Sequence, residues 1–357
     1  MLNNLKILDF TTLLPGPFGT LLLADLGADI VHIARPNKEE ILLDSYLQRN
    51  KKSTVANLKD AGTVEKLKSL VKEYDIIIEQ FRPGVMERLG LGYETLKEIN
   101  PAIIYCSITG YGQTGPYRNR AGHDINYVAL AGIPSHSGNK NSGPPNLGVQ
   151  IADIAGGSLH AAVAILAAVN NRHITGEGQH LDISMTDCAF TLNAVAAATY
   201  FEDGTVPKPE SSLLNGGSFY GYYETADGRF LSIGSLEPAF RKALCEAIGK
   251  PELLPLSFSN KEGDIVQFKE IVAETILLKT LNEWLQIFEQ VDACVEPVLT
   301  FDEVEKHPHF VERGLIVEVE NENGELQKQI ACPIKSNNFT PQYKPARSDT
   351  VVNQLTI

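Results

Sequence analysis

Residues 6–33 read KILDFTTLLPGPFGTLLLADLGADIVHI, and this stretch indicates the class of fold. Lys6 to Phe10 is a short, mostly apolar run, as buried parallel strands are. Phe18 to Leu26 has the length and composition of a helix that ends at Gly27, and a second apolar run covers Asp29 to Ile33. A strand, a helix and a strand in this order predict a βαβ unit, and therefore a parallel sheet at the start of the chain.

The same alternation continues downstream. Predicted helices at Thr63–Tyr74 and Tyr93–Ile99 alternate with predicted strands at Asp75–Glu79 and Ala102–Ile108. Strands that alternate with helices favour a doubly wound sheet with helices on both faces. We therefore predict an α/β fold whose first domain holds a parallel, Rossmann-like sheet.

The composition of the sequence changes after Tyr200. Before it, Gly156–Asn170 predicts a helix buried on most sides, either in the core or against another subunit, followed by a strand at Gln179–Ser184 and a helix at Thr186–Thr199. Beyond a stretch rich in Gly, Pro and Ser, a hairpin and three helices are typical of an α+β domain. Its expected strands are Phe219–Glu224, Arg229–Ile233 and Cys294–Leu299, and its expected helices are Pro238–Ile248, Ile265–Ile276 and Leu281–Gln290. We predict a large domain at 1–205, completed by 315–357, and a small domain at 206–314.

Composition and charge narrow the class of protein. The chain has 357 residues, enough for two cores, and its formal net charge of −13 argues against nucleic acid as a partner. Neither a signal peptide nor an apolar run near the length of a membrane span is evident, so we expect a cytoplasmic protein without a membrane partner. The five cysteines are widely spaced and form no C-x-x-C pair, which favours buried thiols over a disulfide framework or a metal site.

Gly110 to Gly115 match the G-x-G-x-x-G pattern of dinucleotide sites. However, Pro116 and a polar run follow where that pattern requires a helix, and the match is not in the first βαβ unit. We expect instead that these glycines let a loop pass close to a ligand.

Basic residues follow several of the predicted strands. Arg35 stands where a dinucleotide site would carry an acid, and it either holds a phosphate through its fork of donors or is a solvated surface residue. Arg82 is a second candidate anion contact, at the sheet edge where ligands bind in open α/β folds. Arg88, Lys51, Lys52 and Lys59 could add charge, although each alone is more typical of ordinary surface.

His123 and Asp153 are the candidate catalytic pair. His123 lies in the segment AGHDINY and Asp153 in the segment ADIAGG, each before a predicted helix. An imidazole and a carboxylate on opposite sides of a carbon acid can remove a proton from one face and return one to the other. We expect the positive end of the second helix to stabilise ionised Asp153. Asp124 and Asn126 are expected to orient His123 and fix its tautomer.

These segments together resemble the family III CoA transferases, and within them the alpha-methylacyl-CoA racemases. The resemblance covers nearly the whole chain. It rests on Pro15–Pro17, Ala24–Ala28, Arg82–Val85, Arg88–Gly92, Gly110–Gly115, Gly122–Tyr127, Thr175–Gln179, Gly234–Pro238 and Asp292–Val295.

The resemblance implies roles for particular residues. His123 and Asp153 would be the proton-transfer pair at the carbon beside a thioester carbonyl, and Glu237 would form a hydrogen bond near His123. It also implies an interlocked homodimer with its site between the large domain of one subunit and the small domain of the other. The substrate would be an acyl-CoA, and no cofactor is expected beyond the coenzyme A that the substrate carries. Contacts to CoA or its acyl chain are implied for Arg35, Ala56, Asn57, Leu58, Lys59, Arg82, Arg88, Gly122, Asp124, Ile125, Asn126 and Tyr127.

Three hypotheses follow for the activity. The first is a racemase or epimerase that inverts the α-carbon of 2-methylacyl-CoA thioesters through an enolate. The second is a CoA transferase that moves CoA to a carboxylate through an aspartyl-CoA thioester at Asp153, because Pro144–Ile151 is closer to the transferases than to the racemases. The third is a module that only binds acyl-CoA, which would have no use for a paired base and acid.

Overall fold

The computed structural model describes residues 1–36, 43–321 and 324–348. They form two compact units, each discontinuous in sequence. The first unit contains Met1–Ala131, Leu147–Asn193 and the described part of Pro308–Ile357. The second unit contains Gly132–Asn146 and Ala194–His307. These limits differ from the domain limits that the sequence suggests, 1–205 with 315–357 and 206–314. Those limits concern independently folding domains and stay a prediction.

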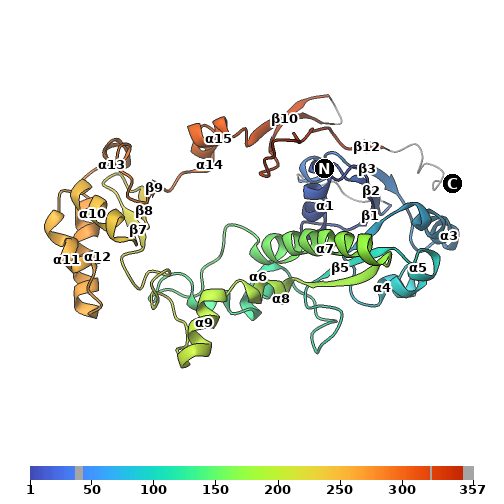
Figure 1. The fold of residues 1–357 in the computed structure, drawn as a ribbon, viewed down its shortest axis with the longest axis horizontal. Helices are drawn as coiled ribbons and strands as arrows, with labels where there is room; N and C mark the ends of the chain where they lie inside the picture. Colours follow the sequence, from blue (N-terminus) through green and yellow to red (C-terminus); the bar gives the residue numbers. More distant parts are fainter. Residues whose placement is uncertain (37–42, 322–323, 349–357) are drawn as a thin grey trace. The chain divides into compact units, whose positions relative to one another are not determined.

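A seven-stranded parallel sheet organises the first unit (Figure 1). The strand order is β12-β3-β2-β1-β4-β5-β6, so the direction of winding reverses between β1 and β4. This is the strand order of doubly wound folds with one short strand added, and the predicted Rossmann-like sheet is confirmed. The strands are β1 (Lys6–Phe10), β2 (Asp29–Ala34), β3 (Lys52–Val55), β4 (Ile76–Glu79), β5 (Ile104–Thr109), β6 (Gln179–Ser184) and β12 (Arg347–Ser348).

Helices cover both faces of this sheet (Figure 1). On one face, Leu8 and Phe10 of β1 share a core with Val64 and Leu67 of α3 and Leu96 of α5. On the other face, α1 packs against η3 and α7, and α7 packs against β5 and β6. The helices of this unit are α1 (Pro15–Asp25), α2 (Asp44–Leu47), α3 (Ala61–Leu70), η1 (Val71–Glu73), α4 (Val85–Arg88), α5 (Tyr93–Ile99), α6 (Asp124–Leu130), η3 (Ala152–Leu159), α7 (His160–Thr175), α8 (Met185–Thr191) and α15 (Pro308–Glu312).

The π-helix η3 and α7 form one continuous helix of 24 residues. By length and composition this helix could cross a membrane, and its most apolar window has a mean hydropathy of 1.6. The expectation that no apolar segment approaches the length of a membrane span is therefore wrong. Ala161, Ile165 and Ala168 are buried in the first unit, whereas Val163 is 67% exposed. Only 44% of its most apolar window is buried, so of the two expected settings the core of this unit is not enough, and burial against another subunit stays a prediction.

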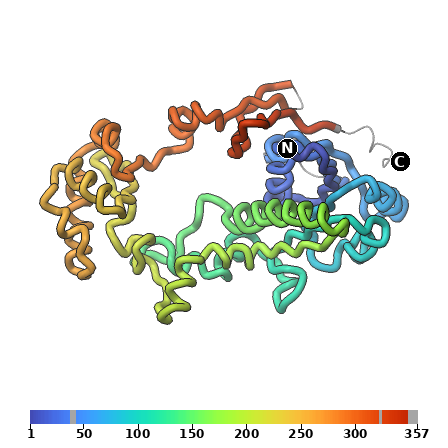
Figure 2. The backbone as a smooth tube through the Cα atoms, in the orientation of Figure 1, coloured from blue at the N-terminus to red at the C-terminus, as the bar shows by residue number. Residues whose placement is uncertain are grey.

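The C-terminal segment lies against the start of the chain (Figure 2). Strands β10 (Ile316–Glu320) and β11 (Leu326–Ile330) form an antiparallel hairpin, and β12 pairs with β3. The buried guanidinium of Arg49 joins the two regions, because it binds both carboxylate oxygens of Asp25 and also donates to the carbonyl of Ile330. Its ring neighbours are Tyr46 and Tyr343, each 4.9 Å from the guanidinium carbon.

The second unit has a three-stranded antiparallel sheet in the order β7-β8-β9. The predicted hairpin is confirmed, and helices pack on it around the buried Trp284. Where the sequence suggested one helix at Thr186–Thr199, the chain instead forms α8 in the first unit and α9 in the second. The elements are η2 (Ile133–His136), α9 (Ala194–Asp203), β7 (Gly221–Glu224), β8 (Phe230–Ile233), α10 (Pro238–Ala247), η4 (Pro251–Leu253), α11 (Leu254–Ser257), α12 (Glu262–Ile276), α13 (Leu281–Phe288), β9 (Val295–Pro297) and α14 (Phe301–Val304).

Candidate active site

A cavity of about 680 Å³ lies at the carboxyl edge of the parallel sheet. Leu13 and Pro15 follow β1, Gln80–Pro83 follow β4, and Gly110–Tyr111 follow β5, and all of them line it. The cavity is therefore at the point where the winding direction reverses, which is where ligands bind in open α/β sheets. Its size is that of a small-molecule site.

His123 and Asp153 line this same cavity. His123 is exposed and precedes α6, and its backbone N–H donates to the side-chain oxygen of Asn126 over 3.0 Å. Asp153 is partly buried in the first turn of η3. The two side chains are close enough for the imidazole to lower the pKa of the carboxyl group. The fold thus brings together two residues that are thirty positions apart, while their catalytic roles stay a prediction.

Asp124 does not have the expected role of orienting His123. Its Oδ1 accepts the backbone N–H groups of Ala152 at 2.7 Å and of Asp153 at 3.0 Å. No hydrogen bond joins it to the His123 ring within the described residues, so the expectation that Asp124 orients His123 is wrong. The side-chain oxygen of Asn126 accepts the backbone N–H of His123 and thereby caps the start of α6. Asp124 instead caps the helix that carries Asp153 and fixes its position relative to α6.

The acidity of Asp153 also differs from the expectation. Burial and the neighbouring Asp124 carboxylate raise the pKa of Asp153 to about 6, although His123 lowers it. The sequence suggested that the positive helix end would favour the ionised form. That effect is outweighed by burial and by the charge of the Asp124 carboxylate, which also occupies the first N–H groups of the helix. A carboxyl group with this pKa exchanges its proton near neutral pH, as an acid–base catalyst must.

Tyr127 forms one wall of the cavity. Its hydroxyl donates to the carbonyl of Gly122 over 2.5 Å, and its ring meets that of Tyr111 edge to face at 5.2 Å. A Cβ atom at Gly110 would lie 2.5 Å from the Tyr127 ring, and one at Gly122 would lie 2.6 Å from it. These glycines are therefore needed for close packing against Tyr127. Burial raises the pKa of this phenol to about 12, so it is protonated at neutral pH.

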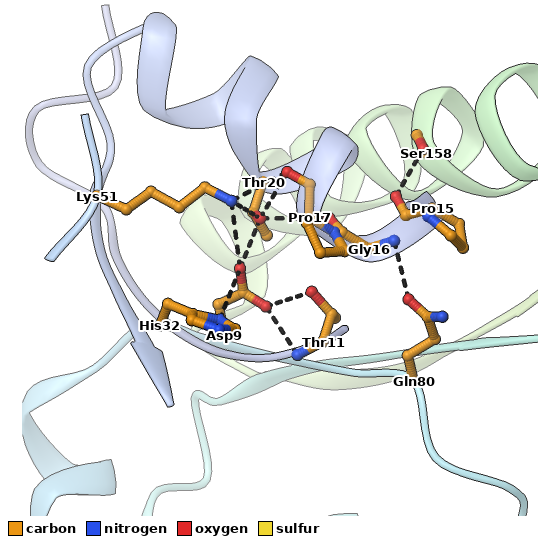
Figure 3. A network of polar contacts seen from close by, with 10 residues as sticks. All are labelled: Asp9, Thr11, Pro15, Gly16, Pro17, Thr20, His32, Lys51, Gln80 and Ser158. Atoms are coloured by element: carbon orange, nitrogen blue, oxygen red, sulfur yellow. Dashed lines mark hydrogen bonds and ion pairs between the residues drawn. The ribbon is translucent and has the colours of Figure 1, made fainter. Parts of the chain in front are cut away.

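The loop that follows β1 is held by a buried polar network (Figure 3). We call Asp9, Thr11, Thr20, His32 and Lys51 the Asp9 cluster. Asp9 Oδ1 accepts the backbone N–H and the hydroxyl of Thr11, and Oδ2 accepts the hydroxyl of Thr20. The Lys51 ammonium donates to Thr20 at 2.7 Å and lies 3.6 Å from Asp9 Oδ2. Lys51 is 1% exposed, so the expectation of an ordinary surface lysine is wrong.

Asp9 keeps its negative charge although it is buried. Burial alone raises the pKa of Asp9, but the charges of Lys51 and His32 and the two threonine hydrogen bonds outweigh it and hold that pKa below its usual value. The cluster anchors Thr11, where the loop to the cavity wall begins. Two further bonds fix the other end of the loop, from Gly16 N–H to Gln80 and from the Ser158 hydroxyl to the Pro15 carbonyl (Figure 3).

Some of the residues expected to contact CoA line the cavity, and the others lie outside it. Arg35 and the segment 56–59 follow the adjacent strands β2 and β3 at the edge that holds the cavity, but they lie outside its lining. Within 56–59, Asn57 and Lys59 are exposed, whereas Ala56 and Leu58 belong to the core. Arg82, Gly122, Asn126 and Tyr127 line the cavity; Arg88, Asp124 and Ile125 do not.

Glu237 lies in the second unit, exposed and immediately before α10. Its expected approach to His123 therefore stays a prediction. The sequence reasoning missed two other residues, since Arg118 and Arg120 also line the cavity. Both stand in the polar run directly before the segment that contains His123, and this proximity in sequence is the signal that could have indicated them.

Comparisons with known proteins agree with this architecture. The family model described as CoA-transferase family III matches residues 2–347. Alpha-methylacyl-CoA racemase from Homo sapiens is 39% identical over 90% of this chain and 84% of its own length. Succinyl-CoA:glutarate CoA-transferase from Homo sapiens is 32% identical over 90% of this chain and 76% of its own length.

Solved structures resemble the fold over its whole length. A crystal structure of Rv3272 from M. tuberculosis has a TM-score of 0.84 and 27% identity, covering 99% of this chain and 98% of its own. A CAIB/BAIF family protein from Brucella suis has a TM-score of 0.82 and 26% identity, with coverage of 99% and 98%. With the family model matched from residue 2 to residue 347, the chain belongs to CoA-transferase family III.

Proposed function

We propose that this protein is a racemase or epimerase of 2-methylacyl-CoA thioesters. The observation that carries the proposal is the presence of His123 and Asp153 in one cavity at the winding reversal of the sheet. The similarity to alpha-methylacyl-CoA racemase over 90% of the chain supports it.

One of the two residues removes the proton from the α-carbon, and the electron pair moves onto the thioester oxygen to form an enolate. The conjugate acid of the other residue then gives a proton to the opposite face, which inverts the centre. The positive charge of Arg82 on the cavity wall favours the negative charge that develops on the enolate oxygen. The reaction needs only side chains and the substrate thioester.

We place the nucleotide end of CoA along β2 and β3. Arg35, Asn57 and Lys59 are exposed there, on adjacent loops that follow strands paired in parallel. Guanidinium and ammonium groups suit phosphates. The pantetheine arm then runs along the sheet edge toward the cavity at the carboxyl ends of β1 and β4.

The proposal includes an interlocked homodimer, as the resemblance of the sequence implies. Leu159, Val163, Leu166 and Ile174 recur at helical spacing along η3 and α7 and are 37% to 78% exposed. A face of this kind is typical of an interface, and a second copy of the chain would cover it. Glu237 of the partner subunit would then reach His123. Mass measurement in solution is expected to give a dimer for the wild type and a larger monomer fraction for Val163→Asp.

The decisive experiment incubates a single epimer of a 2-methylacyl-CoA in deuterated buffer. Uptake of α-deuterium together with the other epimer is expected, and His123→Gln and Asp153→Asn are each expected to abolish formation of the other epimer. His173→Gln, at an exposed histidine near the end of α7, is the matched control and should behave as wild type. A wild-type protein that produces neither the label nor the other epimer would end the proposal.

A CoA transferase is the second candidate, favoured by the 32% identity to the glutarate transferase and by the Pro144–Ile151 segment. In this reaction the Asp153 carboxylate would attack the thioester carbonyl and release CoA thiolate as a mixed anhydride forms. The thiolate would then attack the aspartyl carbonyl, release the first acid as a carboxylate and leave an aspartyl-CoA thioester. The acceptor carboxylate would attack this thioester, and the same two steps in reverse would give the new acyl-CoA and free Asp153. Trapping of an Asp153 adduct with hydroxylamine, and activity that survives His123→Ala, would identify it.

A further inference from the structure

Three arginines line the cavity that holds His123 and Asp153, namely Arg82, Arg118 and Arg120. None of them forms an ion pair within 1–36, 43–321 and 324–348. The Arg120 guanidinium is stacked over Tyr117 at 4.3 Å from the ring centroid, which restrains its plane. Asp153 is the one acid among the described lining residues. Even with the Glu237 carboxylate proposed to approach His123, the cavity of this acidic protein keeps an excess of positive charge.

The position of Arg118 and Arg120 separates them from the proposed nucleotide end of CoA. They stand in the loop after β5, whereas Arg35, Asn57 and Lys59 follow β2 and β3. The sheet order puts β1 and β4 between these two regions. At about 4.8 Å per strand, they are roughly 14–19 Å apart along the sheet edge. The phosphates of CoA are joined to its sulfur by the whole pantetheine arm, so the β5 loop faces the acyl side of the thioester.

We propose that Arg118 and Arg120 bind a carboxylate at the far end of the acyl chain, so that the preferred substrate is an acyl-CoA with a second, free carboxyl group. This inference rests on the proposed placement of CoA. The planar guanidinium fork matches a carboxylate, and two such groups without counter-ions favour an anion over a neutral alkyl chain. A cavity of about 680 Å³ has room for a short dicarboxylic chain beside the reacting carbon.

The test compares two thioesters that differ only in the terminal group. Glutaryl-CoA and pentanoyl-CoA have the same chain length and no branch at the α-carbon, so racemisation leaves both unchanged. Calorimetric titration of the full chain is expected to show glutaryl-CoA binding about tenfold or more tightly, the worth of a charge-assisted hydrogen bond. The Arg118→Gln/Arg120→Gln double variant should lose this preference and keep its affinity for pentanoyl-CoA. Arg313→Gln, at an exposed arginine outside the cavity, is the matched control.

Two results would overturn the inference. One is equal affinity of the wild type for both thioesters, and the other is a double variant that weakens both equally at an unchanged melting temperature. The carboxylate bound by the arginines could belong to the acyl chain or to a free co-substrate. Titration of free glutarate onto the CoA-saturated protein distinguishes these two sources. Tight binding of free glutarate there would assign the arginines to a co-substrate and overturn their assignment to the acyl chain.

A kinetic arm distinguishes this inference from the proposed function. Deuterium exchange is measured on 2-methylpentanoyl-CoA and 2-methylglutaryl-CoA. Exchange on both without preference defeats the carboxylate subsite alone. No exchange on either defeats the racemase proposal, while the binding preference for glutaryl-CoA still supports the subsite.

Discussion

The Asp9 cluster and the cavity are two charged regions near the carboxyl end of β1, and they differ in how their charges are compensated. In the cluster, Asp9 and Lys51 are buried and hold each other with two threonine hydroxyls (Figure 3). In the cavity, Arg118 and Arg120 are exposed and form no ion pair within the described residues. Buried charges need partners within the protein for the chain to fold, whereas exposed charges are solvated and remain available to bind a ligand. The burial of the first region suits a role in folding, and the exposure of the second suits the binding role proposed above.

Removal of Asp9 is expected to have the largest effect on stability. Asp9→Ala removes the carboxylate that lies 3.6 Å from the buried Lys51 ammonium, and breaking a buried pair costs about 3–5 kcal/mol. Urea unfolding at pH 7 measures the loss. The double variant Asp9→Leu/Lys51→Met replaces both charges with apolar groups and should lose much less than Asp9→Ala. A single variant within about 0.5 kcal/mol of wild type would show that the cluster is not a folding element.

Gly110→Ala is expected to have the next largest effect, and on the cavity side. The new Cβ would lie 2.5 Å from the Tyr127 ring, so the ring must move and its hydrogen bond to Gly122 is strained. Overpacking of this kind costs about 1–3 kcal/mol, and the moved wall should lower kcat/KM as well. Gly148→Ala is the control, because no atom lies within 4 Å of its Cβ position. Equal melting temperatures and kcat/KM for the two variants would contradict the close packing.

The parallel sheet was predictable because its central strands are buried on both faces and therefore read as apolar runs. Ile76–Glu79 and Ile104–Thr109 show this clearly. Strand β3 was missed, since Lys52–Val55 is a short, polar segment near an edge of the sheet. The break between α8 and α9 was missed as well, because the alanine-rich sequence of α9 favours helix and the break depends on tertiary contacts.

The candidate site was predictable where the residue type alone suggests the chemistry. It was not predictable where the role of a residue depends on its hydrogen-bond or ion-pair partners. His123 and Asp153 stood out as an imidazole and a carboxylate in glycine-containing loops, and the fold places them in one cavity. The capping role of Asp124 depends on a helix start 28 residues away, which no local pattern reveals. Lys51 read as a surface residue because its partner Asp9 is on a different strand, with another strand between the two.

Asp153→Asn is expected to stabilise the protein. The carboxyl pKa is about 6 in the folded chain against an ordinary value of 3.8, so folding loses stability as pH rises from 3.8 to 6, and the full cost is present above 6. The shift of about two pKa units would correspond to about 3 kcal/mol, and partial exposure reduces this to about 1–2 kcal/mol. A neutral amide removes the cost. Urea unfolding should therefore show a gain at pH 7.5 that shrinks toward pH 4.5.

Asp60→Asn is the control with the opposite sign. Hydrogen bonds from Thr63 hold the pKa of Asp60 below its usual value, so its ionised form contributes stability above that value and loses it as pH falls. This variant should be slightly less stable than wild type at pH 7.5. A loss of stability for Asp153→Asn at that pH would show that the carboxylate is not strained in its site.

Asp124→Asn is expected to have the smallest effect, and on acidity rather than stability. The amide oxygen can still accept the N–H groups of Ala152 and Asp153, so the start of η3 is kept, but the negative charge beside Asp153 is gone. Because that charge raises the pKa of Asp153, its removal should move the acid limb of the pH profile of α-proton exchange to lower pH. Asp124→Ala would also break both hydrogen bonds and lower the melting temperature. An acid limb that stays in place in Asp124→Asn would mean that burial alone sets the acidity of Asp153, and Asp124 would then belong with the Asp9 cluster as a structural charge.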